Sequence, residues 1–599
     1  MGPVDRGEGI RTMSFLDIPE IIQRLVLLLG PAIPFASGVA LLLRTWQAAL
    51  NRLSGWSALP ALAVAVLVPS GTYGEFSWLL LTMRLGVDDT GRVFLFFTAL
   101  LWLLAGVFGR SYLEGDRNQA RFFIFYLLSM SGNFGLILAQ DMVSFYLFFA
   151  LMSFSSYGLV VHNGDAEALR AGRIYIYLVV LGEVMLFSAL VMLYEITGSL
   201  NLSSVSHAPS NEIIFALIFL GFGIKAGALP LHVWLPLAHP AAPTPASAVL
   251  SGAMIKAGLL GWLRFMALGQ VASLEWGGLC ILAGLLAAFF GVIVGVVQTN
   301  PKTVLAYSSI SQMGFMTVGI GAGLLNPAIW PVARTAVIIY AFHHAFAKGA
   351  LFLGVGLAPA TKDSRLQKWW LACGLGLPAL ALAGAPLTTG IVAKTALKLA
   401  IAPLPGPWPG YLGLLLPLAS VGTTLLMVRF LVTVWPDRFA GSQGALGLRL
   451  PWTLMVCFVA LGAWLLPEGQ SSVDKALSLA AFAPALWPVI AGFFLALSAF
   501  VLYRRKTIKR IPSIPAGDLV AIASWVFKPC EQVSRKYLIP RIQTTFATLS
   551  MSLSHFLDLC RKAQLLWYVE EVLGRWFAVG TVLLSMSLVF FLLLILSMR

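Results

Sequence analysis

Long apolar runs repeat along almost the whole chain, and they restrict its fold more than any other feature. A helix of about 20 apolar residues is long enough to cross the hydrocarbon layer of a bilayer. Only helices and closed barrels satisfy their backbone hydrogen bonds inside lipid. The sequence therefore predicts an all-α polytopic membrane protein with about sixteen transmembrane helices. The predicted spans are 25–43, 56–72, 93–109, 122–139, 142–161, 174–195, 212–238, 246–268, 274–297, 304–323, 330–357, 370–401, 410–435, 451–467, 484–503 and 576–598.

The composition agrees with this class. Of the 599 residues, 59% are hydrophobic and 11% are charged, and the mean hydropathy is +0.87. In a soluble protein the net charge of +15 would point to a nucleic-acid partner. In a membrane protein the simpler interpretation is that basic residues gather in cytoplasmic loops. We therefore expect the chain to lie in a lipid bilayer and to bind no nucleic acid.

The basic residues also predict an orientation. Loops that follow odd-numbered spans hold most of the Lys and Arg residues, ending with a dense group from Arg504 to Arg541. Loops that follow even-numbered spans are nearly bare, with Arg84, Arg92 and Lys475 as the main exceptions. Because cytoplasmic loops carry the positive excess, the odd-numbered exits should face the cytoplasm. This predicts a multi-pass protein of the cell inner (plasma) membrane with its N-terminus outside.

Sequence patterns for cofactor chemistry do not occur in this chain. The five Cys residues are scattered without a CxxC pair, which argues against an iron–sulfur or zinc site. There is no GxGxxG motif and no P-loop. The first 20 residues carry both charge signs without an apolar core, so no cleaved signal peptide is expected. We expect no cofactor, no metal and no redox or hydrolytic site, and leave open whether the parent assembly is an enzyme.

The segment 221–258 places ionisable side chains at bilayer depth. It contains Lys225, His232, His239 and Lys256, and it contains Pro230 within a predicted helix. A charged side chain at the centre of a bilayer costs roughly 2.5–3.5 kcal/mol even on mild scales, so such residues are candidates for function. A helix broken at this depth must line a cavity or be buried in protein. Together these features favour a route for a proton or another cation.

A second interrupted span predicts an internal repeat. Lys225 precedes Pro230 in the seventh span, and Lys394 follows Pro378 and Pro386 in the twelfth. The two spans are five spans apart, so units of five helices would have opposite orientations, as in inverted-repeat transporters. The alternative is that membrane helices often contain proline without any repeat.

The tail differs in character from the rest. Four prolines interrupt 512–540, whereas Arg541 to about Val572 keeps helical spacing of its apolar residues. This predicts an amphipathic helix of about 30 residues that lies along the cytoplasmic surface or braces neighbouring subunits. The expected units are 1–110 (N-terminal spans), 111–268 and 269–435 (the two five-helix repeats), 436–503 (extra spans), 504–574 (basic and amphipathic lateral segment) and 575–599 (last span).

Several motifs resemble one family. They are KAGALPLHVWLPLAHPAAPTP at 225–245, MIKAG at 254–258, LAYSSISQMG at 305–314 and HAFAKGALFL at 344–353. The chain resembles the antiporter-like subunits of respiratory complex I, the D-type subunits of multisubunit cation/proton antiporters, and the membrane subunits of group 4 hydrogenases and formate hydrogenlyase. The resemblance covers the third to the thirteenth span. The phrase LMSFSSY at 151–157 is most similar to the hydrogenase branch.

The resemblance implies two half-channels with broken helices, joined by a polar axis at mid-membrane. By motif it implies that Lys225, Lys256 and Lys394 carry protons, together with His344 and Lys348 of the eleventh span. A buried lysine loses its charge easily, and a neighbouring charge can restore it. His232, His239 and Tyr307 are candidates for relaying protons through water. His232 and His239 have the alternative role of orienting the helix break.

One position departs from the family pattern. The family has a glutamate in the fifth span that pairs with the lysine of the seventh, and here that position is Ala150. Glu183 in the sixth span is the nearest embedded carboxylate, and we expect it to act as the partner of Lys225. The alternatives are that another subunit supplies the acid, or that the first half-channel is degenerate.

Three functions follow from these expectations. The leading one is a proton- or sodium/proton-translocating subunit of a multisubunit respiratory, hydrogenase or antiporter complex. Its partners would be other membrane subunits, further antiporter-like subunits among them, and a cytoplasmic partner. The second is a structural or coupling scaffold, and the third is an energising subunit for a partner that handles an inorganic anion. The sequence leaves the ion, the direction of transport and the parent complex open.

Overall fold

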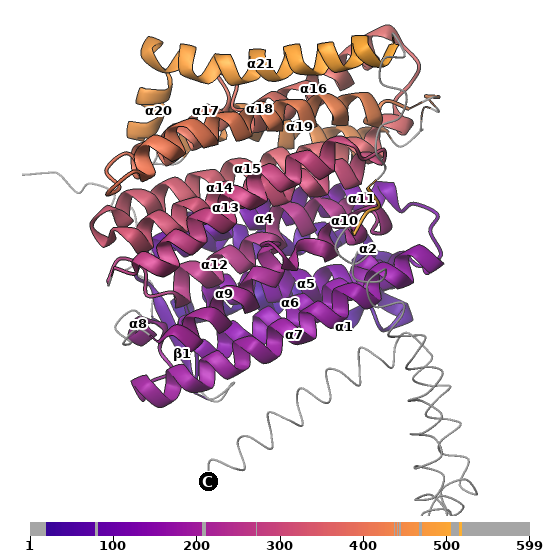
Figure 1. Ribbon diagram of the computed structural model, residues 1–599. Coiled ribbons are helices and arrows are strands. Elements are labelled where there is room, and N and C mark those ends of the chain that lie inside the picture. The colour runs from indigo at the N-terminus through magenta and orange to yellow at the C-terminus, as the bar shows by residue number, and fades with distance from the viewer. Residues whose placement is uncertain are drawn as a thin grey trace, which may run out of the picture. The chain divides into compact units, whose positions relative to one another are not determined.

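The architecture is almost entirely helical (Figure 1). The computed structural model describes residues 20–77, 82–205, 211–270, 272–436, 438–439, 441, 445–465, 470–504 and 514–517. Within these residues, eleven helices are long and apolar enough to cross a membrane. This confirms the predicted class of all-α polytopic membrane protein. The predicted lateral helix and the last span lie outside the described residues.

Each predicted span from 93–109 onward to 484–503 coincides with one helix or with two or three consecutive helical segments. The predicted span 56–72 begins earlier, because α2, η2 and α3 form one apolar run from Arg44 to Leu67. The continuous helices are α1 (Glu20–Ala40), α4 (Asp89–Tyr112), α5 (Gln119–Leu138), α6 (Met142–Val160), α7 (Ala166–Thr197), α13 (Leu274–Val296), α14 (Pro301–Leu325), α15 (Trp330–Ala360), α18 (Trp408–Val434), α19 (Ala445–Leu461) and α21 (Leu479–Arg504). The short ones are α2 (Arg44–Leu53), η2 (Ser54–Ala58), α3 (Leu59–Leu67), α8 (Leu202–Val205), η5 (Pro327–Ile329), η6 (Gly462–Leu465) and α20 (Gln470–Ala476).

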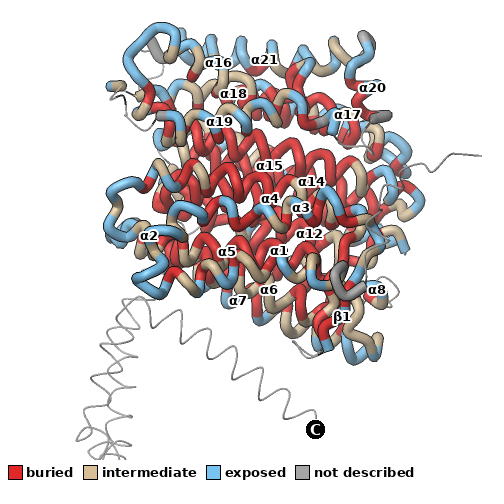
Figure 2. The backbone as a smooth tube through the Cα atoms, turned by 180° about the vertical axis from the view of Figure 1, so that it is seen from behind, coloured by how far each residue is buried: buried red, intermediate tan, exposed pale blue. Residues whose placement is uncertain are grey.

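Helix α15 forms the centre of the packing. Figure 1 shows the helices side by side, with α21 along one edge and α7 along the other. Helix α15 contacts α4, α14, α16 (Arg365–Ala383), α17 (Thr389–Ile401) and α19. The apolar segment of α15 is 100% buried, compared with 11% for that of α21. The buried colour in Figure 2 is concentrated on α4, α14 and α15. The polar residues His343, His344 and Lys348 in the middle of α15 are therefore shielded from the surroundings of the molecule.

Two spans are broken at glycines. Helix α9 (Glu212–Ala226) ends at Gly227 (φ +74°), and after Pro230 the chain continues as η3 (Leu231–Val233) and α10 (Trp234–Ala241). Pro230 therefore lies in the break, and not inside a helix as the sequence predicted. Helix α16 (Arg365–Ala383) ends at Gly384 (φ +87°), and α17 (Thr389–Ile401) follows. Both glycines adopt the left-handed conformation that other residues rarely tolerate.

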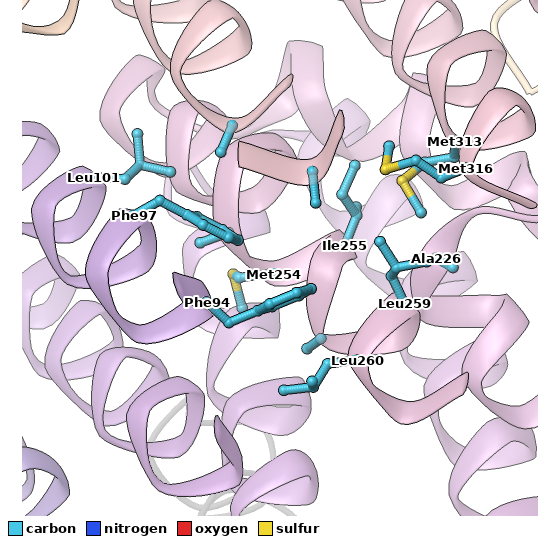
Figure 3. Close-up of a cluster of buried hydrophobic side chains, with 14 of the residues drawn as sticks. Phe94, Phe97, Leu101, Ala226, Met254, Ile255, Leu259, Leu260, Met313 and Met316 are labelled. Carbon is cyan, nitrogen blue, oxygen red and sulfur yellow. The ribbon is translucent and has the colours of Figure 1, made fainter. Parts of the chain in front are cut away.

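The eighth span holds a distortion that the sequence did not reveal. It runs as α11 (Thr244–Val249), then a π-helical turn η4 (Leu250–Met254), then α12 (Ile255–Phe265). A π-turn widens a helix locally and changes the pairing of its carbonyls. Figure 3 shows the apolar side chains around this turn, which come from α4, α9, α12 and α14. They enclose the turn in a water-excluding core.

A short hairpin lies at one end of the bundle. Strands β1 (Tyr73–Phe76) and β2 (Met83–Gly86) pair antiparallel with Tyr73 opposite Gly86. The Arg84 guanidinium forms an ion pair with Glu75 at 2.5 Å. This hairpin was not predicted. The expected unit boundaries and the inverted repeat stay predictions.

Candidate functional site

Lys225 occupies the last turn of α9, just before the helix break. Its side chain is buried, and Nζ donates to the Tyr175 hydroxyl at 2.8 Å and to Ser156 Oγ at 3.4 Å. Nζ also lies 5.3 Å from the centre of the Tyr175 ring and 5.8 Å from that of Trp234. Hydroxyls and aromatic faces stabilise an ammonium group, but less strongly than a carboxylate does.

Glu183 is the acidic residue of this neighbourhood. It lies on α7 about two turns beyond Tyr175, so the two side chains share a face of the helix. Its side chain is buried, and neither carboxylate oxygen has a hydrogen-bond partner. Its negative charge interacts electrostatically with Lys225. Ala150, where the family has its glutamate, is on α6. The acid therefore approaches Lys225 from the sixth span, without a direct ion pair.

Lys256 and His344 meet at the centre of the bundle. Lys256 Nζ lies 2.6 Å from His344 Nδ1, and it donates to the Ser251 carbonyl at 2.6 Å. Ser251 belongs to the π-turn η4, so this distortion helps to hold the lysine. Both side chains are fully buried or nearly so. A protonated lysine and a protonated histidine can only donate hydrogen bonds. At this distance one of the two nitrogens must therefore accept the hydrogen bond from the other.

Lys348 continues this cluster one turn along α15. Its Nζ donates to the Leu305 carbonyl at 2.7 Å and to Ser308 Oγ. The Leu305 carbonyl also accepts from Ser309 Oγ at 3.1 Å, and Ser309 Oγ lies 2.8 Å from Ser251 Oγ. A set of short polar contacts thus joins the surroundings of Lys256 to those of Lys348.

Lys394 lies beyond the second helix break. Its Nζ donates to the Ala383 carbonyl at 2.6 Å and to Ser420 Oγ at 2.9 Å, and it is 5.6 Å from the centre of the Phe315 ring. A Cβ at Gly384 would lie only 2.7 Å from Lys394 Cδ. The glycine therefore provides both the turn and the space for the lysine.

His343 lies between the central and terminal lysines. Its Nδ1 lies 2.8 Å from Thr389 Oγ1, at the start of α17. His343 interacts electrostatically with the charges of both Lys394 and Lys256. Beside it, the Tyr340 hydroxyl donates to Gln312 Oε1 at 2.9 Å. These polar residues were missed because a single polar side chain in an apolar span does not indicate which helix it faces.

The remaining predicted residues are His239, His232 and Tyr307. His239 is buried against the Phe352 ring at 4.5 Å, neither ring nitrogen has a hydrogen-bond partner, and the charges of Lys348, Lys302 and Lys256 act on it. His232 is buried with its ring 5.0 Å from that of Phe290. The Cβ of Tyr307 faces Gly295 of α13, whereas its neighbour Ser308 contacts Lys348.

Arg264 serves a structural contact at one end of α12. It forms two hydrogen bonds of 2.9 Å with the Asp88 carboxylate at the start of α4. Among the described residues, no group of three His, Cys, Asp or Glu side chains has a metal-binding arrangement.

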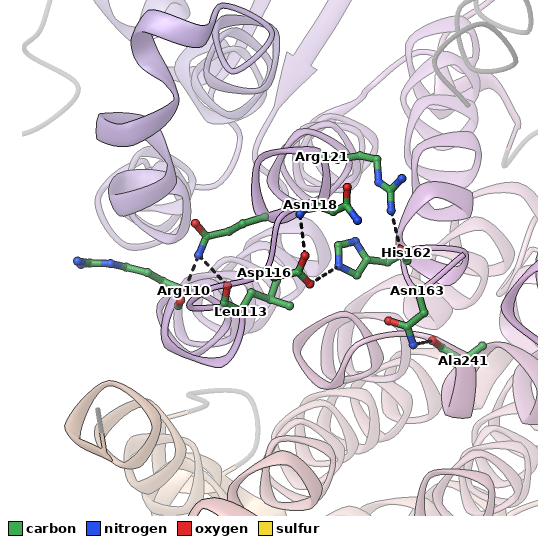
Figure 4. Close-up of polar contacts among 9 residues, drawn as sticks. Arg110, Leu113, Asp116, Asn118, Arg121, His162, Asn163 and Ala241 are labelled. Carbon is green, nitrogen blue, oxygen red and sulfur yellow. Dashed lines mark hydrogen bonds and ion pairs between the residues drawn. The ribbon is translucent and has the colours of Figure 1, made fainter. Parts of the chain in front are cut away.

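A second ionisable pair lies in the loops outside the spans (Figure 4). His162 Nε2 lies 3.0 Å from Asp116 Oδ2, and Arg121 donates to the His162 carbonyl. Burial lowers the pKa of His162 below its ordinary value of 6.5, and the Asp116 carboxylate opposes part of this shift. Burial favours a higher pKa for Asp116, but hydrogen bonds from His162 and from the Asn118 N–H outweigh it, so the pKa falls below 3.8.

The fold and these buried lysines define a class of multi-pass membrane protein with two broken spans. A family model described as NADH:quinone oxidoreductase/Mrp antiporter, TM, matches residues 139–402. The chain is 31% identical over 382 residues to NADH-quinone oxidoreductase subunit N of Polaromonas naphthalenivorans (strain CJ2), covering 61% of this chain and 75% of that relative. The chain belongs to this family of antiporter-like membrane subunits, which confirms the resemblance found in its motifs.

Two further comparisons agree. Hydrogenase-4 component B of Escherichia coli (strain K12) is 30% identical over 338 residues, covering 52% of this chain and 50% of that relative. The matched part of the chain therefore spans about half the length of that relative. A solved structure of the Mrp complex from Dietzia sp. DQ12-45-1b has a TM-score of 0.70 at 23% identity, covering 90% of this chain and 63% of that one. This last likeness concerns the fold alone.

Proposed function

We propose that the chain is a proton-translocating subunit, or a sodium/proton-exchanging one, of a multisubunit membrane complex. The relatives named above are components or subunits of such complexes. The observation that carries the proposal is the 2.6 Å contact between Lys256 Nζ and His344 Nδ1 in a buried environment. Such a contact lets one proton pass between two bases without either leaving its place.

The proton path would be made of three groups. Lys225 with Glu183 forms the first, Lys256 with His344 and Lys348 forms the second, and Lys394 forms the third. A buried ammonium is destabilised by desolvation, so each lysine changes protonation when a neighbouring charge appears or leaves. Hydroxyls and water molecules between the groups would complete the transfer. His343, which is acted on by Lys256 and Lys394, is the proposed link to the last group.

Glu183 is the proposed replacement for the missing acid at Ala150. Its carboxylate is buried and acts on Lys225 electrostatically, while its oxygens stay free of hydrogen bonds. An acid that is not locked in a direct ion pair can alternate between stabilising the lysine and releasing it. His239, His232 and Tyr307 are the proposed relay residues.

The experiment compares proton flux in sealed vesicles that contain the intact complex, with wild type, His344→Gln and His232→Gln. Glutamine keeps much of the volume of histidine but cannot take up a proton. The proposal expects flux to fall strongly in His344→Gln while assembly survives. Normal flux in His344→Gln would overturn the proposed Lys256–His344 relay. His232→Gln reports separately whether the histidine of the helix break acts as a relay or only orients the break.

A second candidate function is favoured by one observation. The family carboxylate is replaced by Ala150, and Glu183 makes no hydrogen bond to Lys225. A scaffold subunit with a degenerate first half-channel would have this appearance. In that case Lys225→Ala would leave flux unchanged while the parent complex still needed the chain for assembly.

A further inference from the structure

Basic and aromatic side chains gather where α16 and α19 begin. Lys368 Nζ lies 2.5 Å from Asp363 Oδ1 and 4.7 Å from the centre of the Phe439 ring. The Arg449 guanidinium lies 5.9 Å from the centre of the Trp370 ring, and its Nη2 donates to Gln367 Oε1 at 2.7 Å. We call this set, with Lys362, the basic–aromatic cluster. It does not touch the buried lysines of the proposed path.

The cluster has more positive charge than its own carboxylates offset. Segments 362–368 and 435–449 contain five basic residues, Lys362, Arg365, Lys368, Arg438 and Arg449, and two acidic ones, Asp363 and Asp437. Arg365 and Arg438 are exposed. The basic side chains of these segments therefore outnumber the acidic ones, and an anionic group would offset the excess charge.

Two exposed apolar stripes begin at the cluster. Helices α16 and α19 are in contact, and both start at its end of the bundle. On each helix, large apolar side chains recur at intervals that keep them on one outer face. The exposed members include Leu366, Trp369 and Leu380 on α16 and Leu446, Leu450 and Leu461 on α19. Leu366 is 80% exposed and Leu446 is 75% exposed, so the stripes are open at their first residues.

We propose that the basic–aromatic cluster binds the phosphate headgroup of an anionic phospholipid, whose acyl chains lie along the stripes of α16 and α19. Phosphate oxygens would accept hydrogen bonds from Arg449 and Lys368, because guanidinium and ammonium groups are the usual phosphate donors. The aromatic rings suit the level of the headgroups in a bilayer. A lipid is favoured over a protein partner because the apolar stripes continue from the charged cluster into the membrane-spanning part. This inference is independent of ion transport.

The test uses the full-length protein in an uncharged detergent, titrated with phosphatidylglycerol or phosphatidylcholine and followed by native mass spectrometry. The main variant is Lys368→Gln with Arg449→Gln. Since each basic side chain near an anionic headgroup contributes about a fivefold factor, phosphatidylglycerol binding should weaken roughly 25-fold. Arg365→Gln with Arg438→Gln should have a similar effect without changing packed residues. Arg170→Gln, at an exposed arginine in the first turns of α7, is the matched control and should bind as wild type does.

Three results would overturn the proposal. Equal binding of both lipids by the wild type would remove the role of the headgroup charge. Competition by free inorganic phosphate at the same concentration as the lipid would assign the cluster to a soluble anion. Loss of a co-purifying subunit in the variants, with lipid binding unchanged, would assign the surface to a protein partner.

Discussion

At the scale of single residues, the lysines of the proposed path are held mainly by groups that do not titrate. Lys256, Lys348 and Lys394 each donate to a backbone carbonyl, those of Ser251, Leu305 and Ala383. A neutral amine still carries N–H groups, so these hydrogen bonds survive the loss of a proton. The lysines therefore keep their positions in both protonation states, as a proton carrier requires. Lys225 is different, because its partners are hydroxyls, aromatic rings and the more distant Glu183.

Glu183 gives the sharpest prediction at this scale. Replacing Glu183 with Gln removes the charge that acts on Lys225 while keeping the shape, and we expect proton flux to fall about tenfold, which corresponds to about 1.4 kcal/mol. Adding Ala150→Glu to this variant restores a carboxylate at the family position and should recover much of the flux. The measurement is proton flux in sealed vesicles. Full transport by Glu183→Gln alone would sink the proposed partnership.

His162 predicts a pH dependence of stability. Because burial lowers its pKa below 6.5, the unfolded chain binds a proton more readily than the folded one. The stability that comes from neutral His162 is complete above about pH 6.5 and is lost as the pH falls toward the lower folded pKa. Asp116, whose ordinary pKa is 3.8, does not titrate in this range.

The thermal unfolding midpoint should therefore decrease when the pH is lowered from 7.5 to 5.5. The decrease should be smaller in His162→Gln than in the wild type. An equal loss in the wild type and the variant would show that His162 does not carry this dependence. Arg170→Gln again serves as a surface control, because Arg170 is exposed and lies outside the Asp116–His162 pair.

At the scale of elements, helix breaks and a π-turn set the positions of the lysines. Lys225 precedes one break and Lys394 follows the other, while Lys256 follows the π-turn η4 by two residues. Freed carbonyls at such sites give a lysine acceptors that a regular helix would not provide. The sequence predicted both breaks from prolines, but the helices end at Gly227 and Gly384, and Pro378 lies inside α16. The sequence did not predict the π-turn, because no residue type marks the insertion of one extra residue into a helix.

Gly384 tests the role of the second break. Gly384→Ala would force a side chain into φ +87° and place its Cβ 2.7 Å from Lys394 Cδ. We expect a loss of about 1–2 kcal/mol of stability from the left-handed backbone alone and a large loss of flux. Gly376→Ala on the same helix is the control, because nothing lies within 4 Å of its Cβ. Equal behaviour of the two variants in thermal unfolding and flux would contradict the role assigned to Gly384.

At the scale of the whole molecule, the sequence predicted the membrane class and most spans, because hydropathy and span length are properties of single segments. It also selected Lys225 with Glu183, and Lys256 with His344 and Lys348, as candidates. It could not predict that His343 faces Thr389, or that Tyr307 begins on the face toward α13, since helix rotation depends on packing against neighbours. The β1–β2 hairpin was missed because its two strands have only four residues each, which is too short to show an alternating pattern between long apolar runs.

The central claim is that one lysine path crosses the molecule from Lys225 to Lys394. The most direct measurement is proton flux in sealed vesicles that contain the intact complex, comparing wild type with Lys225→Ala, Lys394→Ala and Lys398→Ala. Lys398 is an exposed lysine one turn beyond Lys394 and serves as the matched control. The account predicts that flux is lost in the first two variants and kept in the third, with assembly intact in all. Normal flux in Lys225→Ala, with Lys394→Ala inactive, would contradict it and leave the first half-channel without a role in transport.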